Sequence, residues 1–224
     1  MKSNYSKEVP IKGRVRICLE LIKSFSLKGK VLVDIGCSFG WLEKEIVKLN
    51  PRKVIGVDPD KKALAFARKS VNVANFLEGS AIDIPISDST ADVVILFDVI
   101  EHVPKNKELV VLKEISRILK KGGVLLFSTP NANLLSNLFD IAWYFGHRHY
   151  SESNIRDFMS KSGFGVTKLI KRGNLLSSLY LTWFYIAKRI LKVSQPRSNF
   201  FEKLDDDGYR KDGITDIFLV AVKK

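Results

Sequence analysis

Apolar residues along the first 130 positions form short runs that alternate with segments in which they recur at helical spacing. The run at 92–97 is almost unbroken, which is typical of a central parallel strand buried on both faces. The alternation predicts an α/β fold in which helices cover a mostly parallel sheet. We expect strands at 31–34, 54–57, 75–77, 92–97 and 124–128, and helices at 14–25, 40–49, 60–70 and 105–119, the last one capped by Gly122 and Gly123.

The pattern changes after residue 130. Two apolar runs rich in aromatic side chains, 134–145 and 175–191, lie outside the regular alternation. The second run is too short and too mixed to span a membrane, which takes about 20 apolar residues. Beyond these runs we expect a helix from the N-cap Ser151 to about residue 162, strands at 166–171 and 217–222, and a solvated acidic turn at 205–208.

The first predicted strand leads into an acid and a loop with two glycines, Asp34, Gly36 and Gly40. Glycine adopts positive φ and lets the backbone approach a ligand closely. The next strand ends in Asp58, and an acid at this place in a βαβ unit can accept hydrogen bonds from both ribose hydroxyls. The loop lacks the G-x-G-x-x-G spacing of dinucleotide sites. The acid Asp34 suits a ligand with a positive amine better than a pyrophosphate.

The loop 34–40 resembles motif I of the class I S-adenosylmethionine-dependent methyltransferases, and the resemblance continues in order at 56–58, 79–85, 91–103 and 119–126. The small stand-alone enzymes of this class, which include ubiquinone-pathway O-methyltransferases, are the most similar. The resemblance implies a Rossmann-like, doubly wound sheet of seven mostly parallel strands with an antiparallel last strand. It also implies an enzyme with S-adenosyl-L-methionine as cofactor, bound by Asp34, Gly36, Cys37, Ser38, Gly40, Asp58, Pro59, Ser80, Ala81 and Asp98.

Two residues depart from the family pattern. Ser38 replaces the middle glycine of the loop, and Ser80 replaces the acid that usually reaches the adenine amine. The adenine contact is therefore less well supported by the resemblance than the ribose contact. A methyltransferase-like protein that binds the cofactor without turnover is one alternative to an active enzyme.

Three histidines supply the candidates for proton transfer. His102 follows the predicted strand 92–97, and His147 and His149 follow the predicted strand 124–128. An oxygen nucleophile needs a base whose pKa lies near the working pH, and histidine meets this condition. We take His149 and His102 as the candidate catalytic bases. An alternative is a divalent cation held by Asp98 and Glu101, although two carboxylates are a weak signal for a metal, and our prediction includes no metal.

The formal net charge is +13, and residues 158–201 contain no acidic side chain. Basic proteins bind anionic partners such as membrane surfaces or nucleic acid. The second apolar run ends in basic residues, as in helices that lie on anionic lipid. We therefore expect one domain, 1–224, with cap segments at 131–150 and 173–213 over the site of a small or lipid-like acceptor.

The cysteine content, the amino terminus and the charge indicate where the protein acts. Two cysteines without a C-x-x-C pair, and an amino terminus without an apolar signal, favour a cytoplasmic protein. The basic charge adds the expectation of peripheral contact with an anionic membrane. It also supports an RNA methyltransferase as an alternative, against which stands the absence of an Asn/Asp-Pro-Pro-aromatic signature.

Overall fold

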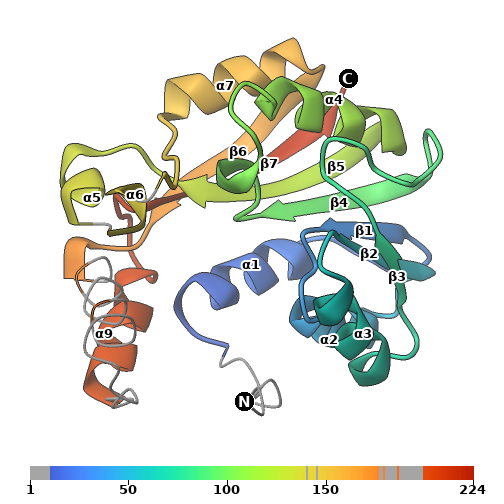
Figure 1. The fold of residues 1–224 in the computed structure, drawn as a ribbon, viewed down its shortest axis with the longest axis horizontal. Helices are drawn as coiled ribbons and strands as arrows, with labels where there is room; N and C mark the ends of the chain where they lie inside the picture. Colours follow the sequence, from blue (N-terminus) through green and yellow to red (C-terminus); the bar gives the residue numbers. More distant parts are fainter. Residues whose placement is uncertain (1–10, 140, 145, 177–178, 180–185, 187–198) are drawn as a thin grey trace.

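The computed structural model describes residues 11–139, 141–144, 146–176, 179, 186 and 199–224 (Figure 1). The described residues form one seven-stranded sheet in the order β3-β2-β1-β4-β5-β7-β6. Strand β7 is antiparallel to both of its neighbours and the remaining pairs are parallel, which confirms the predicted fold class. The strands are β1 (Val31–Ile35), β2 (Lys53–Asp58), β3 (Asn75–Glu78), β4 (Ala91–Phe97), β5 (Leu119–Pro130), β6 (Phe164–Arg172) and β7 (Asp216–Lys223).

Helices cover both faces of the sheet (Figure 1). Two separate apolar clusters explain this arrangement: one holds the sheet against α4 and α7, and the other holds it against α1, α2, α3 and α9. The helical elements are α1 (Gly13–Lys23), α2 (Trp41–Ile46), η1 (Val47–Leu49), α3 (Lys61–Ser70), η2 (Ile100–His102), α4 (Glu108–Ile118), α5 (Leu134–Phe139), α6 (Ile141–Tyr144), α7 (Glu152–Lys161) and α9 (Asn199–Gly208).

The strand order reverses between β1 and β4, and this point positions the ligand site. Asp34 in β1 pairs with Gly56 of β2 on one side and with Ile95 of β4 on the other. Ligands of open α/β sheets bind beyond the carboxyl ends of the strands at such a switch point. The loops after β1, β2 and β4 all begin at this edge, so the residues predicted from separate motifs are brought to one place.

Side chains cap two helices, and the cap at Ser151 confirms the prediction. Asp60 caps α3 by accepting the backbone N–H groups of Lys62 and Ala63. Ser151 caps α7, and its hydroxyl accepts the backbone N–H of Asn154, whose side chain in turn accepts the N–H of Ser151. Both caps satisfy N–H groups that a helix start leaves unpaired.

Two predictions about helix ends and turns are wrong. Gly122 and Gly123 do not cap α4, because Leu119 already adopts an extended conformation and pairs with Ala91, so that both glycines lie inside β5. Residues 205–208 form the end of α9 and not a solvated turn. Asp206 is buried there and accepts the backbone N–H of Gly13 at 2.7 Å, a contact that local sequence does not reveal.

The two long apolar runs can be tested only in part. Residues 134–139 and 141–144 of the first run form the short helices α5 and α6. Of the second run, 177–178, 180–185 and 187–191 lie outside the described residues. Within the described part of the chain, no helix has the length and apolar character needed to cross a lipid bilayer.

Candidate functional site

A cavity of about 990 Å³ opens at the switch point of the sheet, between α1, the loop after β1 and the end of β4. This volume is at the upper end of the range of about 300–1,000 Å³ that is typical of small-molecule sites. Six predicted cofactor residues line it: Asp34, Gly36, Cys37, Ser38, Gly40 and Asp98. Helix α1 adds Arg14, Val15, Cys18 and Leu19 to the lining.

The glycine loop needs glycine at both of its ends. Gly36 has φ +84°, and a Cβ there would lie 2.4 Å from a methyl carbon of Val99. Gly40 has φ +76°, and a Cβ there would lie 3.0 Å from the side chain of Ala67. Ser38 between them also adopts positive φ, +49°, which a residue with a side chain does at a cost of about 1–2 kcal/mol. The loop thus keeps a conformation that suits glycine although serine occupies its middle.

Asp58 holds this loop against β2. One of its carboxylate oxygens accepts the backbone N–H of Ser38 at 2.9 Å, and the other accepts the N–H of Asp60 at 2.8 Å. Each oxygen keeps a second lone pair that a hydroxyl group can use. Asp58 does not itself line the cavity, and neither do Pro59, Ser80 and Ala81. The hydroxyl of Ser80 accepts the backbone N–H of Ile82 at 3.4 Å.

A pair of buried carboxyl groups lies under the loop, and sequence reasoning identified only one of them. Asp34 is 4% exposed, and Glu43 of α2 is completely buried. The charge of Glu43 opposes ionisation of Asp34, and neither oxygen of Glu43 has a hydrogen-bond partner among the described residues. Burial raises the pKa of Asp34 well above its ordinary value and that of Glu43 to about 7. Glu43 was overlooked because an acid in a first helical turn usually faces solvent.

Arg14 is a second cavity residue that sequence reasoning missed. Its guanidinium donates a hydrogen bond to Asp98 at 2.9 Å and forms an ion pair with Asp216 at 2.6 Å, so it joins α1 to the end of β4 and the start of β7. Asp98 has φ +55° and also accepts the hydroxyl of Ser128 at 2.8 Å. These two donors fix the Asp98 carboxylate at the cavity edge in a strained backbone conformation, which is common at functional sites. A basic residue at the start of the leading helix was the available signal.

The histidines lie together beyond the ends of β4 and β5, outside the lining of the cavity. The rings of His102 and His147 are 4.8 Å apart between centroids, and those of His147 and His149 are 5.8 Å apart. Nδ1 of His149 lies 2.7 Å from the side-chain oxygen of Asn137. An amide oxygen only accepts hydrogen bonds, so Nδ1 carries the proton and Nε2 is the basic nitrogen. The structure therefore brings both candidate bases to one place.

The comparisons with known proteins agree with this geometry. Residues 33–127 match the family model described as "Methyltransferase domain". A "Probable S-adenosylmethionine-dependent methyltransferase" of Mycolicibacterium smegmatis is 30% identical over 139 residues, which are 62% of this chain and 53% of that protein. A "Ubiquinone biosynthesis O-methyltransferase" of Aliivibrio fischeri is 34% identical over 135 residues, 57% of this chain and 55% of that protein.

Solved structures extend the likeness to nearly the whole chain. The structure titled "Structure analysis of Geranyl diphosphate methyltransferase in complex with SAM" has a TM-score of 0.68 at 16% identity and covers 93% of this chain and 85% of that chain. This likeness concerns the fold alone. The chain spans about half the length of the curated relatives that it matches.

The cavity residues also fit the cofactor. Buried carboxyl groups under a glycine loop suit a cationic amino group, and an acid behind the loop suits a ribose. The match to the family model, the strand order and this cavity make the chain similar to the class I S-adenosylmethionine-dependent methyltransferases.

Proposed function

We propose that this protein transfers a methyl group from S-adenosyl-L-methionine to a hydroxyl oxygen of a small or lipid-like acceptor. The observation that supports it most directly is the position of His149, whose ring lies 5.8 Å from that of His147 beyond β4 and β5. Bound S-adenosyl-L-methionine supplies an activated methyl group, so the protein has to align the acceptor and remove its proton. Alignment alone can lower the barrier by about 7–11 kcal/mol.

His149 is the group we assign to proton removal. Its Nδ1 contacts Asn137, which selects the tautomer with a basic Nε2. Trp143 lies beside it, with 5.0 Å between the ring centroids. The indole supplies an apolar wall next to the base, which suits an acceptor with an aromatic or aliphatic body. The ubiquinone-pathway relatives of the chain are named O-methyltransferases, which agrees with a hydroxyl acceptor.

The test measures S-adenosylhomocysteine formed from pools of phenols, hydroquinones, lipids and RNA. We expect turnover with a hydroxyl-bearing organic pool. His149→Ala should then lower turnover by about 10²- to 10⁴-fold and leave the donor affinity unchanged. His102→Ala is the matched variant, because it removes the other candidate base. Turnover with RNA alone would overturn the acceptor class, and full turnover by the His149 variant would overturn the base.

Donor binding has its own test. Asp58→Ala removes the acceptor that we assign to the ribose hydroxyls and should weaken S-adenosylmethionine binding by about 1.5–3 kcal/mol. Calorimetry measures it, with S-adenosylhomocysteine and NAD as comparison ligands. The same variant loses the bond from Ser38, so its melting without ligand shows whether the loop is also loosened. An unchanged affinity contradicts the ribose assignment.

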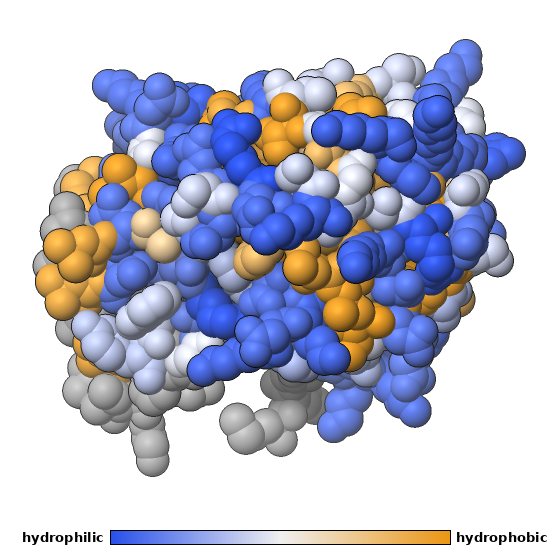
Figure 2. All heavy atoms as spheres, turned by 90° about the horizontal axis from the view of Figure 1, so that it is seen from above, coloured by the Kyte–Doolittle hydropathy of each residue, from blue (hydrophilic) through white to orange (hydrophobic). Residues whose placement is uncertain are grey.

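A second proposal concerns the membrane. Apolar side chains gather at the end of the molecule that contains α5 and α6 (Figure 2). Leu134 is 83% exposed, Tyr144 64% and Leu138 56%. These helices lie near the candidate bases in the chain, and the following residues 158–201 hold no acid. We propose that this end of the protein contacts an anionic membrane from which an apolar acceptor enters.

A further inference from the structure

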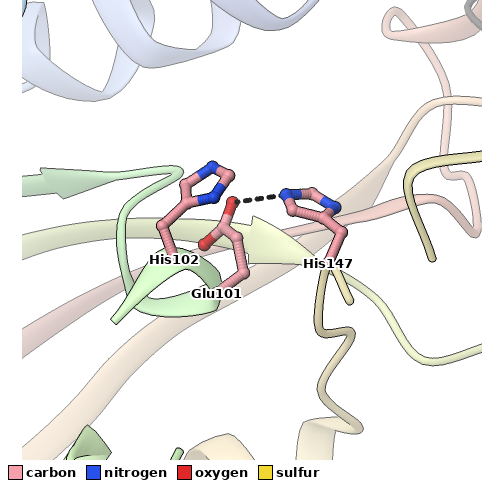
Figure 3. A group of neighbouring side chains, drawn as sticks. All are labelled: Glu101, His102 and His147. Carbon is pink, nitrogen blue, oxygen red and sulfur yellow. Dashed lines mark ion pairs between the residues drawn. The ribbon is translucent and has the colours of Figure 1, made fainter. Parts of the chain in front are cut away.

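A cluster of possible metal ligands lies beyond the ends of β4 and β5, and it joins His102, one of the two candidate bases, to two residues that the assignment above does not use. Glu101 and His102 lie on the short turn η2 after β4, and His147 lies on the loop before Tyr150. Figure 3 shows the Glu101 carboxylate between the two imidazole rings. One ligand atom from each residue lies within 4.8 Å of the others. Residues that are distant in sequence thus present two nitrogens and one carboxylate oxygen to the same point.

The carboxylate of Glu101 is costly where it lies. Glu101 is 3% exposed, and only one of its oxygens, Oε2, accepts a hydrogen bond, from Thr129 at 3.2 Å. The other oxygen, Oε1, has no hydrogen-bond partner among the described residues and lies 3.9 Å from Nε2 of His147. A buried carboxylate loses the solvation of water, and the single hydrogen bond from Thr129 without a close cation does not compensate for this loss. A cation next to Oε1 would remove this cost.

Arg148 holds the two segments of the cluster together. Its guanidinium donates to the backbone oxygens of Ile100 at 3.0 Å and Glu101 at 3.3 Å, and also to that of Val103. It further pairs with Glu108 at 2.7 Å. Because Arg148 directly follows His147, these bonds fix the loop with one ligand to the turn with the other two. Supporting contacts of this kind orient the ligands of metal sites.

We propose that Glu101, His102 and His147 bind a divalent transition-metal ion. Two imidazoles and one carboxylate suit Zn²⁺, Co²⁺ or Fe²⁺, whereas Mg²⁺ and Ca²⁺ prefer oxygen ligands throughout. Ligand bonds of about 2.0–2.2 Å require the three atoms to approach to within about 3–3.5 Å of each other. The distance of 3.9 Å between Oε1 and Nε2, and the distances from these atoms to the ligand nitrogen of His102, which do not exceed 4.8 Å, therefore have to shorten when the ion binds.

The position of the cluster indicates what the ion does. His102 is exposed, so the site is open to solvent on one side, and three protein ligands leave coordination positions for another molecule. This part rests on the proposed function: the open positions receive the acceptor hydroxyl, and coordination lowers the pKa of that hydroxyl. His149, whose ring lies next to that of His147, then removes the proton from a more acidic group.

The experiment measures metal binding directly, on chelator-treated, full-length protein without a histidine tag. Co²⁺ and Zn²⁺ are titrated by calorimetry, and the visible absorption of Co²⁺ reports its coordination. We expect one equivalent to bind and to raise the melting temperature. Glu101→Gln and His147→Ala should each weaken binding at least about tenfold. His149→Ala is the matched control, since it removes a neighbouring imidazole that is not a ligand.

The outcomes are distinct. No stoichiometric binding, binding of Mg²⁺ alone, or equal binding by parent and Glu101→Gln protein would each overturn the proposal. Weakening by His149→Ala as large as that by His147→Ala would overturn the ligand set. S-adenosylmethionine affinity, measured on the same variants, should not change and also shows that they are folded. A parent protein that transfers methyl groups but binds no metal ion would overturn this proposal and leave the proposed methyl transfer intact.

Discussion

Single residues decide the chemistry of the donor cavity, and the buried acids are the clearest example. Asp34 lines the cavity, and the charge of the completely buried Glu43 opposes its ionisation. Neither oxygen of Glu43 has a hydrogen-bond partner in the described part of the chain. Ionised carboxylates are costly in such a place, so the stability of the fold depends on the protonation of these acids, and this dependence can be measured.

Glu43→Gln should flatten the dependence of stability on pH. The pKa of Glu43 rises from 4.5 to about 7 because the side chain is buried, so between these values the folded protein binds more protons than the unfolded chain. Stability must then fall as the pH rises from 4.5 to 7. Glutamine does not titrate, so the variant should lose less stability than the parent protein over this window, and Asp34 accounts for part of the dependence that remains.

Scanning calorimetry at steps between pH 4.5 and 7.5 provides the measurement. Glu45→Gln is the matched control: it changes a neighbouring carboxylate on the same helix that pairs with Lys48 near the surface. Equal loss of stability by the Glu43 variant and the parent protein across this range would contradict a raised pKa of Glu43 in the folded protein.

At the scale of elements, the least predictable feature is the contact between α1, near the beginning of the sequence, and α9, near its end. Asp206 of α9 accepts the backbone N–H of Gly13 at 2.7 Å and pairs with Arg16 at 3.1 Å. Arg16 thereby links the two helices, and α1 in turn lines the donor cavity. Residues near the end of the sequence therefore support a helix at its beginning.

Asp206→Asn should lower the free energy of unfolding by about 1.5–3 kcal/mol, the range for hydrogen bonds to charged groups. Although burial opposes it, bonding to Gly13, Arg16 and Arg210 lowers the pKa of Asp206 to about 2. The stabilisation is therefore present above about pH 4 and is lost as the pH falls towards 2.

Urea unfolding at pH 7 measures the effect of this substitution. Asp207→Asn, next to it on the exposed side of α9, removes a surface pair with Arg210 and should change stability by less than about 1 kcal/mol. Equal effects of the two substitutions would contradict a specific link between α1 and α9.

At the scale of the whole molecule, the uneven surface is the property that bears most on the acceptor. Helix α1 lines the cavity, whereas one group of exposed apolar side chains lies on α5 and α6 (Figures 1 and 2). One fold can support many different reactions, so the architecture of the sheet does not indicate which acceptor the protein uses. The chemistry of that surface has to be tested by itself.

Leu134→Ser combined with Leu138→Ser should weaken binding to anionic vesicles at least about tenfold, because burying one leucine side chain is worth about 1.5–3 kcal/mol. Co-sedimentation with vesicles at low and high salt measures it, and high salt should weaken the parent protein as well. Val73→Ser is the matched control, since Val73 is 72% exposed and precedes β3 on another part of the molecule. Vesicle binding unaffected by the double substitution would contradict the membrane proposal.

The sequence by itself determined the elements of the sheet, the glycine loop and the helix cap at Ser151. Apolar spacing and turn residues report on local conformation, and the acids near the ends of β1, β2 and β4 follow from strands that end at one edge. Local patterns failed where distant segments meet, as in the helix that holds Asp206. Only the tertiary structure decided that Glu43 is buried near Asp34, that Arg14 binds Asp98, and that His147 joins Glu101 and His102. These contacts join residues brought together by packing, and burial gives them properties that a list of residue types does not contain.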